Sequence, residues 1–178
     1  MRTSGRVAFV GIFAVAFAAT GLAQEMPKPA PEMAQLASFD GSWTCEGKMF
    51  QTPMSPAGTM KSTVEMRPEL NGFFHVGTIK GTSANMPPFE GRVQMTYDTG
   101  LKQFVMLWVD NMGGWAQNMS NGWKGDTITF EGDGHMGGQT MKGRDTFTKS
   151  GANSMKHTWA MQMQGKWVEA GEETCTKK

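Results

Sequence analysis

The chain has 178 residues, of which 39% are hydrophobic, and its 17 basic and 16 acidic residues give a net charge of +1. Charges of both signs are interspersed, so the composition excludes the basic face with which nucleic-acid-binding proteins neutralise phosphates. The length is typical of one domain with a substantial core.

The first 23 residues have the order of a secretory signal peptide. Arg2 and Arg6 precede an apolar run from Val7 to Ala19, and small residues follow up to Ala23. This order predicts a signal peptide over residues 1–23 that is cleaved after Ala23, with a retained N-terminal anchor as the alternative. The run is shorter than the roughly 20 residues of a membrane-spanning helix, and no other stretch approaches that length. We therefore expect a periplasmic or secreted protein with no membrane span, monomeric by default.

A linker and a short helix are predicted before the main domain. Residues 24–31, QEMPKPAP, form a Pro-rich linker. Pro31 then stands at the first position of a helix in PEMAQLASF, with Met33, Leu36 and Ala37 on one side. We expect this helix to lie across one end of a single domain that covers residues 32–178.

From Gly41 onward the sequence predicts only short β-strands, because β-branched and aromatic residues alternate with polar ones between Gly-containing turns. The expected strands cover residues 42–50, 58–67, 73–82, 90–98, 102–110, 114–121, 126–132, 139–148, 154–163 and 166–176. The expected turns include Asn71-Gly72, Thr99-Gly100, Asn121-Gly122, Asp133-Gly134, Ser150-Gly151 and Gln164-Gly165. Ten consecutive strands predict an all-β antiparallel meander closed into a barrel, since closure leaves no unpaired edge. An immunoglobulin-type sandwich is the structural alternative.

The two cysteines favour closure. Cys45 lies in the first expected strand and Cys175 in the last, and in an exported protein an even number indicates a disulfide. A bridge requires the two Cα atoms to come within about 7 Å, as they would if the first and last strands were neighbours. Two unpaired buried thiols are the alternative.

Alternation along the expected strands predicts an apolar inner wall. In residues 154–163, His157 and Trp159 share one face with three methionines, and polar residues occupy the other face. The same alternation in the other strands predicts a barrel that binds a small hydrophobic ligand. The candidate ligand-binding residues are Trp43, Met95, Tyr97, Met106, Trp108, His157, Trp159 and Met161.

Methionine replaces the usual aliphatic residues in this wall. Beyond residue 23 the chain has 16 methionines but only four leucines and two isoleucines. Methionine is flexible and adapts to varied apolar partners, and a barrel of this strand number can enclose a small ligand. A purely structural barrel with a packed, Met-filled core explains the same composition.

Metal and haem binding are further alternatives. His157, Met161 and Met163 offer imidazole and thioether ligands for a soft ion such as cuprous copper. His157 and Met161 alone would span about 13 Å of strand, so other segments would have to contribute, such as the expected Gly-rich loop with His135 and Met136. Haem ligation through His157 or His75 is a related alternative. The simplest expectation is that His157 hydrogen-bonds a neighbouring group, and we predict no cofactor.

Catalytic signatures of the common hydrolase, metalloprotease, phosphate-binding and redox types are missing, which favours a protein that is not an enzyme. Asp110 follows Trp108 at the end of an expected strand. It is interpreted as the cap of the following turn, with a functional carboxylate as the alternative. Arg144 and Asp145 are adjacent, so their side chains should point to opposite faces of their strand.

Four segments resemble a known bacterial family, the one catalogued as domain of unknown function 1579. They are LASFDGSWTCEG, PFEGRVQMTYDTGLKQFVMLWVDNMG, GDTITFEGDG and GRDTFT, and the likeness runs from about Met33 to the C-terminus. The family pattern has a Leu-x-Gly-x-Trp opening, a Pro-Phe-x-Gly step, a Gly-Tyr-Asp turn and a Trp-x-Asp strand end. Here Thr96 replaces the glycine before Tyr97 and Asp98. The resemblance implies a lipocalin-like barrel and transfers no activity.

Overall fold

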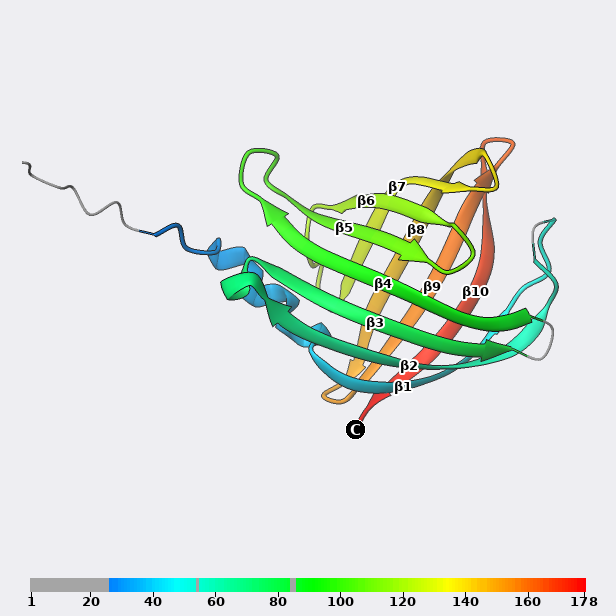
Figure 1. Cartoon of the computed structure of the whole chain (residues 1–178), viewed down its shortest axis with the longest axis horizontal. Helices are drawn as coiled ribbons and strands as arrows, with labels where there is room; N and C mark the ends of the chain where they lie inside the picture. The colour runs from blue at the N-terminus through cyan, green and yellow to red at the C-terminus, as the bar shows by residue number, and fades with distance from the viewer. Residues whose placement is uncertain (1–25, 54, 84–85) are drawn as a thin grey trace, which may run out of the picture.

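The computed structural model describes residues 26–53, 55–83 and 86–178, so the predicted signal peptide lies outside the described residues. Ten antiparallel strands form a closed barrel in the order β1-β10-β9-β8-β7-β6-β5-β4-β3-β2 (Figure 1). Each strand except the first pairs with the one before it in the chain, and β10 closes the barrel against β1, as the meander prediction requires. The strands are β1 (Gly41–Met49), β2 (Gly58–Glu69), β3 (Phe74–Ser83), β4 (Met86–Asp98), β5 (Gln103–Asp110), β6 (Trp115–Ser120), β7 (Thr127–Met136), β8 (Gln139–Gly151), β9 (Ser154–Met163) and β10 (Lys166–Lys177).

A short helix closes one end of the barrel. The 3₁₀ helix η1 (Pro31–Phe39) lies at the left of Figure 1 and buries Met33, Leu36 and Phe39. These residues recur every third position, which fits the three residues per turn of a 3₁₀ helix. The prediction that Ala37 shares the apolar face is therefore wrong, and Ala37 is exposed. A single-turn 3₁₀ helix, η2 (Leu70–Gly72), joins β2 to β3.

Two indole groups hold η1 against the barrel. The Trp43 Nε1–H donates to the Phe39 carbonyl oxygen at 2.8 Å, and the Trp123 Nε1–H donates to the Gln35 carbonyl oxygen at 3.1 Å. The Phe39 carbonyl is at the end of the helix, where intrahelical partners run out, whereas the Gln35 carbonyl lies in its middle. The helix is thus fixed by polar contacts as well as by its buried face.

The seam between β1 and β10 carries the predicted disulfide. Cys45 lies opposite Cys175 in the register of these strands, their Cα atoms are 4.0 Å apart, and the bond joins residues 130 positions apart in the chain. The prediction of a Cys45–Cys175 bridge is confirmed.

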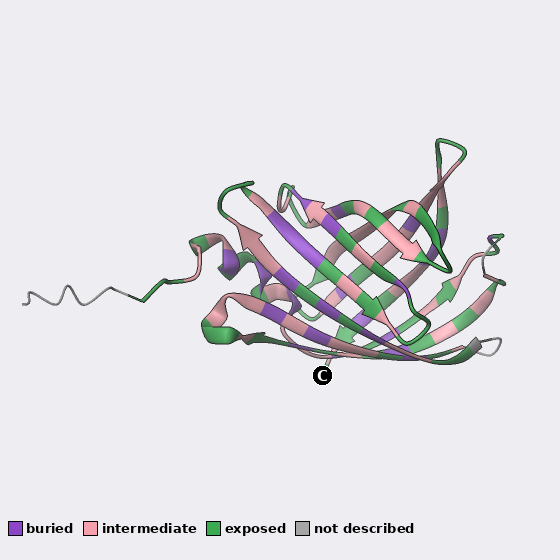
Figure 2. Ribbon diagram, turned by 45° about the horizontal axis from the view of Figure 1, so that its top comes forward, coloured by how far each residue is buried: buried purple, intermediate pink, exposed green. Residues whose placement is uncertain are grey.

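The barrel interior has two unlike halves. In the half next to η1, here called the closed half, the inward side chains are buried in one cluster. In the opposite half, the open half, most inward side chains are only half-buried (Figure 2). The inward residues of the open half include Phe89, Trp108, Met141, Gly143, Trp159, Met161 and Met163. The space that they surround is called the lumen below.

Two of the predicted turns are wrong. Asp133-Gly134 lies inside β7, which continues to Met136, and the turn to β8 is formed by Gly137 and Gly138, both with positive φ (57° and 78°). His135 and Met136 are therefore strand residues instead of loop residues. At the other end of β8 the strand includes Gly151, because a register shift between Lys149 and Gly151 adds a residue before the turn. The Gln164-Gly165 turn is confirmed, with positive φ at both positions.

Within the described part of the chain, neither helix has the length and apolar character that crossing a bilayer demands.

Candidate functional site

The centre of the interior holds a histidine between two carboxylates. His157 points inward from β9 and contacts Asp145 of β8 through Nε2 (3.0 Å) and Glu173 of β10 through Nδ1 (3.1 Å). Strand pairing explains the placement: His157 lies opposite Glu173 on one side, while Asp145 is two residues along β8 from its other partner, Phe147. Paired residues of neighbouring strands point to the same face, so the three groups must meet inside the barrel.

Two polar side chains complete this network. The Asn118 amide of β6 donates to Asp145 Oδ2 at 3.0 Å, and the Ser62 hydroxyl of β2 donates to Glu173 Oε2 at 3.1 Å. Each of the four carboxylate oxygens therefore has one hydrogen-bond partner, which offsets the cost of removing carboxylates from bulk water. The network crosses the barrel at the boundary between the closed half and the lumen, and we regard it as the floor of the lumen.

The carboxylates keep His157 charged. Burial by itself would lower the pKa of the imidazole, but the hydrogen bonds and negative charges of Asp145 and Glu173 outweigh it and raise the pKa from 6.5 to about 9. At neutral pH the group is an imidazolium ion, and the triad with Asp145 and Glu173 carries a net charge of −1. Their side chains are 18%, 24% and 10% exposed, so the triad borders solvent inside the barrel.

Aromatic rings surround the imidazole. Phe147 stacks on it with ring centroids 4.3 Å apart and an interplanar angle of 8°, and Trp159 lies 5.2 Å away, tilted by 35°. An imidazolium gains from contact with aromatic faces as well as from its carboxylate partners. The floor of the lumen is therefore both charged and aromatic.

Inward glycines let two indole rings lie flat against the wall. A Cβ on Gly171 would stand 2.1 Å from the Trp159 ring, and one on Gly91 would stand 2.2 Å from the Trp108 ring. These rings occupy the space that a side chain on the neighbouring strand would otherwise fill. They line the lumen without crossing it.

A row of four paired residues crosses the wall of the open half. Asn118, Gly132, Gly143 and Met161 are direct partners across β6, β7, β8 and β9. The middle two, here called the glycine strip, have no side chains, and a Cβ on Gly143 would find no other atom within 4 Å. The lumen is open at this point.

Two alanine substitutions on this wall should have opposite effects. Gly171→Ala should lower the free energy of unfolding by roughly 1–3 kcal/mol, because the new methyl group forces the Trp159 ring to move. Gly143→Ala has room and should be neutral or stabilising by about 0.4–1 kcal/mol. Urea unfolding measures both, and a shifted tryptophan emission in Gly171→Ala alone reports the ring movement. Equal effects would contradict the difference in space between the two sites.

The eight predicted ligand-binding residues all face inward but divide between the two halves of the barrel. Trp43, Met95 and Met106 are buried in the closed-half cluster, with Tyr97 packed against it. His157, Trp159 and Met161 belong to the open half or its floor, and Trp108 faces the open half while it also packs against the edge of that cluster. The role of these residues in ligand binding stays a prediction, and the open space lies beside the second group.

The sequence interpretation missed three polar members of the floor, Ser62, Asn118 and Glu173, and it singled out the fourth, Asp145, through its orientation relative to Arg144. Strand alternation predicts an inward side chain at each of these positions, because residues two apart share a face. Glu173 is two residues from Cys175, and Ser62 is two residues from Val64. The expectation of an entirely apolar wall obscured this signal. The expectation that His157 hydrogen-bonds a neighbouring group is confirmed, and so is the opposite orientation of Arg144, which pairs with Glu131 at 2.7 Å, and Asp145.

The geometry gives little support to a metal or haem at His157. Both ring nitrogens already contact carboxylates, and a protonated imidazole cannot ligate a metal. His75 is 5% exposed and its Nδ1 contacts Asp40 at 2.6 Å in the closed half. Among the described His, Cys, Asp and Glu residues, the ligand atoms of Cys45, Glu173 and Cys175 alone converge as a metal site would require, but the two sulfurs form the disulfide.

Asp110 serves as the cap of the turn after β5. Its Oδ1 accepts hydrogen bonds from the Met112 and Gly114 amides, both at 2.9 Å, and its Oδ2 accepts one from Trp108 Nε1 at 3.0 Å. The last bond fixes the indole in the lumen wall. The capping interpretation is therefore confirmed.

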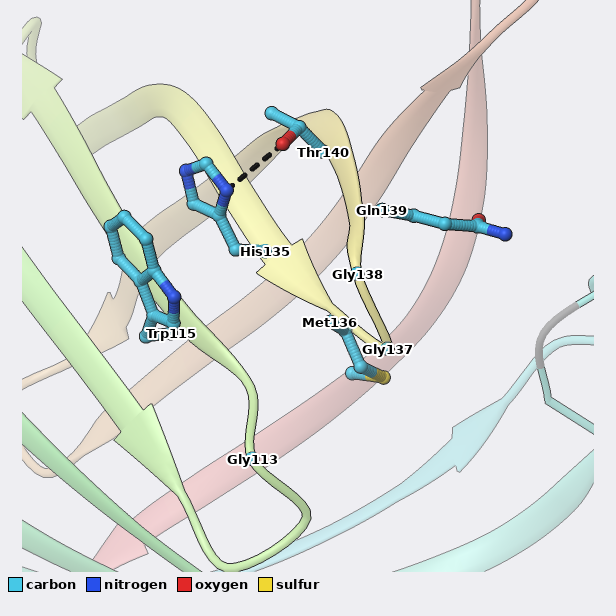
Figure 3. Close-up of a pocket in the computed structure, with 8 residues that line it drawn as sticks. All are labelled: Gly113, Trp115, His135, Met136, Gly137, Gly138, Gln139 and Thr140. Atoms are coloured by element: carbon cyan, nitrogen blue, oxygen red, sulfur yellow. Dashed lines mark hydrogen bonds between the residues drawn. The ribbon is translucent and has the colours of Figure 1, made fainter.

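A separate pocket of about 230 Å³ lies at the hairpin between β7 and β8, outside the lumen (Figure 3). The Trp115 and His135 rings stack there with centroids 3.8 Å apart, and His135 Nδ1 contacts the Thr140 hydroxyl at 2.9 Å. Gln139 points away from these rings in Figure 3. The polar and aromatic groups of this pocket largely satisfy one another, so the lumen is the stronger candidate site.

Comparison with known proteins extends the evidence for the barrel. The model of the family described as "Protein of unknown function (DUF1579)" matches residues 28–177. A search of curated proteins finds no match. The crystal structure of Rv2717c from M. tuberculosis is similar over 85% of this chain and 99% of its own, with 13% identity and a TM-score of 0.63. The S-type phycobiliprotein lyase CPES from Guillardia theta is similar over 84% and 98%, with 10% identity and a TM-score of 0.51. At these identities the likenesses show a shared fold.

Proposed function

The chain belongs to the DUF1579 family, and we propose that this member binds a small apolar molecule in the lumen without catalysing a reaction. One observation carries the proposal: the closed half of the barrel is filled, whereas inward aromatic and methionine side chains of the open half are half-buried around open space at Gly143. Ligand sites in proteins are concave and mostly apolar, with a few convergent polar groups. The lumen has this composition, with the His157 network as its polar floor.

Methionine suits such a role. Met141, Met161 and Met163 face the lumen from β8 and β9, and Met49 and Met60 do so from β1 and β2. All five are half-buried. Their unbranched, polarizable side chains can adjust to ligands of different shape.

We also propose that the protein works outside the cytoplasm, in the periplasm or as a secreted protein. The Cys45–Cys175 disulfide supports this location, because disulfides persist in oxidising compartments. The signal-peptide pattern of residues 1–23 supports it independently.

Two adjacent positions on β8 allow a matched test. Gly143 faces the lumen and Lys142 faces outward, where it pairs with Asp133 on the surface. Nile red, a neutral dye that fluoresces in apolar surroundings, should bind the wild-type protein saturably with one-to-one stoichiometry. Gly143→Leu should weaken this binding by at least about tenfold, since the isobutyl group fills the open space, whereas Lys142→Leu should leave it unchanged.

The outcome separates the lumen from other surfaces. Thermal unfolding should show both leucine variants to be folded before the titration is interpreted. Equal dye affinity in the wild-type protein and in both variants would place the dye elsewhere and reject the lumen as the site. Absence of dye binding to the wild-type protein would reject the proposed function.

A further inference from the structure

The charges that face the lumen do not balance. Asp145 and Glu173 carry two negative charges against the single positive charge of His157, and Asp110 adds a third carboxylate near the mouth. On the outer face, by contrast, several acids have cationic partners, as in the pairs Glu46–Lys61, Glu131–Arg144 and Glu172–Lys156. Among the described Lys and Arg residues whose register points inward, Lys166 is exposed at the rim, and Lys149 and Lys177 lie over Trp123 and Trp43 at the closed end.

A second, independent observation concerns Asn118. Asn118 is 3% exposed and faces the interior, yet its side-chain oxygen Oδ1 has no hydrogen-bond partner among the described residues. The orientation of the amide is set by Nδ2, which donates to Asp145. Oδ1 therefore points over Gly132, where a Cβ would stand 2.6 Å from it. A buried acceptor without a donor costs about 1–3 kcal/mol, so it calls for an explanation.

The unpaired acceptor and the excess carboxylate meet at the same place. Asn118 Oδ1 lies over one member of the glycine strip, and Asp145, the most exposed member of the triad at 24%, is two residues from the other, Gly143. At Gly143 a Cβ would find no other atom within 4 Å, so no side chain covers that member of the strip. A small group that donates hydrogen bonds and carries positive charge could enter there and contact both acceptors.

We propose that the ligand of the lumen carries a cationic, hydrogen-bond-donating head group, such as a primary ammonium, which sits on the glycine strip between Asp145 and Asn118. This inference rests on the proposed function and specifies its ligand class. The apolar part of the ligand then extends toward the mouth along Trp159 and Met161. An ammonium has three donors and no acceptor, so it satisfies Asn118 Oδ1, neutralises the net charge of the floor and gains from the neighbouring indole face. A carboxylate or phosphate head group would instead face the negative charge of Asp145, and an ionised carboxylate has no hydrogen to donate to Asn118 Oδ1.

Three probes with the same hydrocarbon chain test the proposal: octylammonium, octanol and octanoate, each used to displace Nile red at pH 7 and low salt. Octylammonium should bind roughly tenfold or more tightly than octanol, because hydrogen bonds to charged groups exceed neutral ones by about one factor of ten in affinity. Octanoate should bind more weakly than octanol. Added salt should reduce the difference between the charged probes.

A matched pair of variants locates the head group. Asp145→Asn removes a negative charge from the floor, and Asp133→Asn removes one from the outer face, where Asp133 pairs with Lys142. The preference for octylammonium over octanol should fall several-fold in Asp145→Asn and persist in Asp133→Asn. An unchanged preference in a folded Asp145→Asn protein would overturn the proposed seat of the head group.

The relative affinities of the three octyl probes for the wild-type protein test the ligand class without any variant. The proposed ligand class would be overturned if octanol bound as tightly as octylammonium or more tightly, or if no octyl probe displaced a lumen-bound dye. Either result would leave the lumen as an apolar binding site. Failure of Nile red itself to bind would instead reject the proposed function. The two proposals therefore fail by different results.

Discussion

Replacement of His157 by glutamine is expected to lower the free energy of unfolding by about 3 kcal/mol at pH 7. The substitution removes the positive charge that lies 3.0 Å from Asp145 and 3.1 Å from Glu173, and leaves two inward carboxylates facing each other. It also removes the ring on which Phe147 stacks. Urea unfolding monitored by circular dichroism measures the change. His135→Gln, at the surface hairpin, is the matched control and should change stability by less than about 0.5 kcal/mol.

The same site predicts the pH dependence of stability. The pKa of His157 is about 9 in the folded protein, against an ordinary value of 6.5 for the imidazole in an unfolded chain. A group whose pKa is raised by folding stabilises the protein fully below the lower value and loses that contribution as pH rises through the higher one. The wild-type protein should therefore lose roughly 3 kcal/mol between about pH 6.5 and pH 9.

The glutamine variant separates this contribution from other titrations. It should lack the loss of stability in that window, because it has no imidazole to titrate there. A wild-type protein whose stability is flat across the window would contradict the imidazolium assignment.

Loss of the disulfide should have the largest effect on stability. The bond closes a loop with a sequence separation of 130 residues, for which the chain-entropy model gives about 5 kcal/mol. The double variant Cys45→Ala/Cys175→Ala should therefore unfold at much lower urea concentration than the oxidised wild type.

Reduction of the wild-type protein provides the control. Cys45 is completely buried and Cys175 is 9% exposed, so dithiothreitol should act slowly on the folded protein and rapidly after unfolding. Refolding in reductant should reproduce the lower stability of the double variant. A double variant within about 1 kcal/mol of wild type would show that strand pairing at the seam suffices without the bond.

The barrel was predictable because its signals are local and repeated. Each strand alternates apolar and polar residues, turn dipeptides such as Gln164-Gly165 punctuate them, and the two cysteines indicate which strands meet. Asp133-Gly134 has the same composition as a turn, but its aspartate pairs outward with Lys142 and its glycine faces inward between neighbouring strands. Local composition cannot distinguish these two uses of glycine.

The network around His157 was harder to foresee because it depends on register. Alternation puts Asp145, His157 and Glu173 on inward faces, but the alignment of β8, β9 and β10 decides that the three side chains meet at one level. A slip of two residues in one strand would keep every side chain on its face and separate the groups. The openness of the lumen also depends on which glycines lie beside large side chains, as Gly171 does and Gly143 does not.

The seam between β1 and β10 constrains how the chain can fold. β1 cannot gain its second neighbour until residues 166–177 have been synthesised, so the pairing that closes the barrel is the last to become available to the chain. Such long-range pairing is slow compared with hairpin formation. An unclosed intermediate exposes two strand edges and the apolar closed-half wall together, which makes it prone to aggregate and to bind chaperones. Oxidation of Cys45 and Cys175 then links β1 to β10 covalently and prevents the barrel from reopening at this seam.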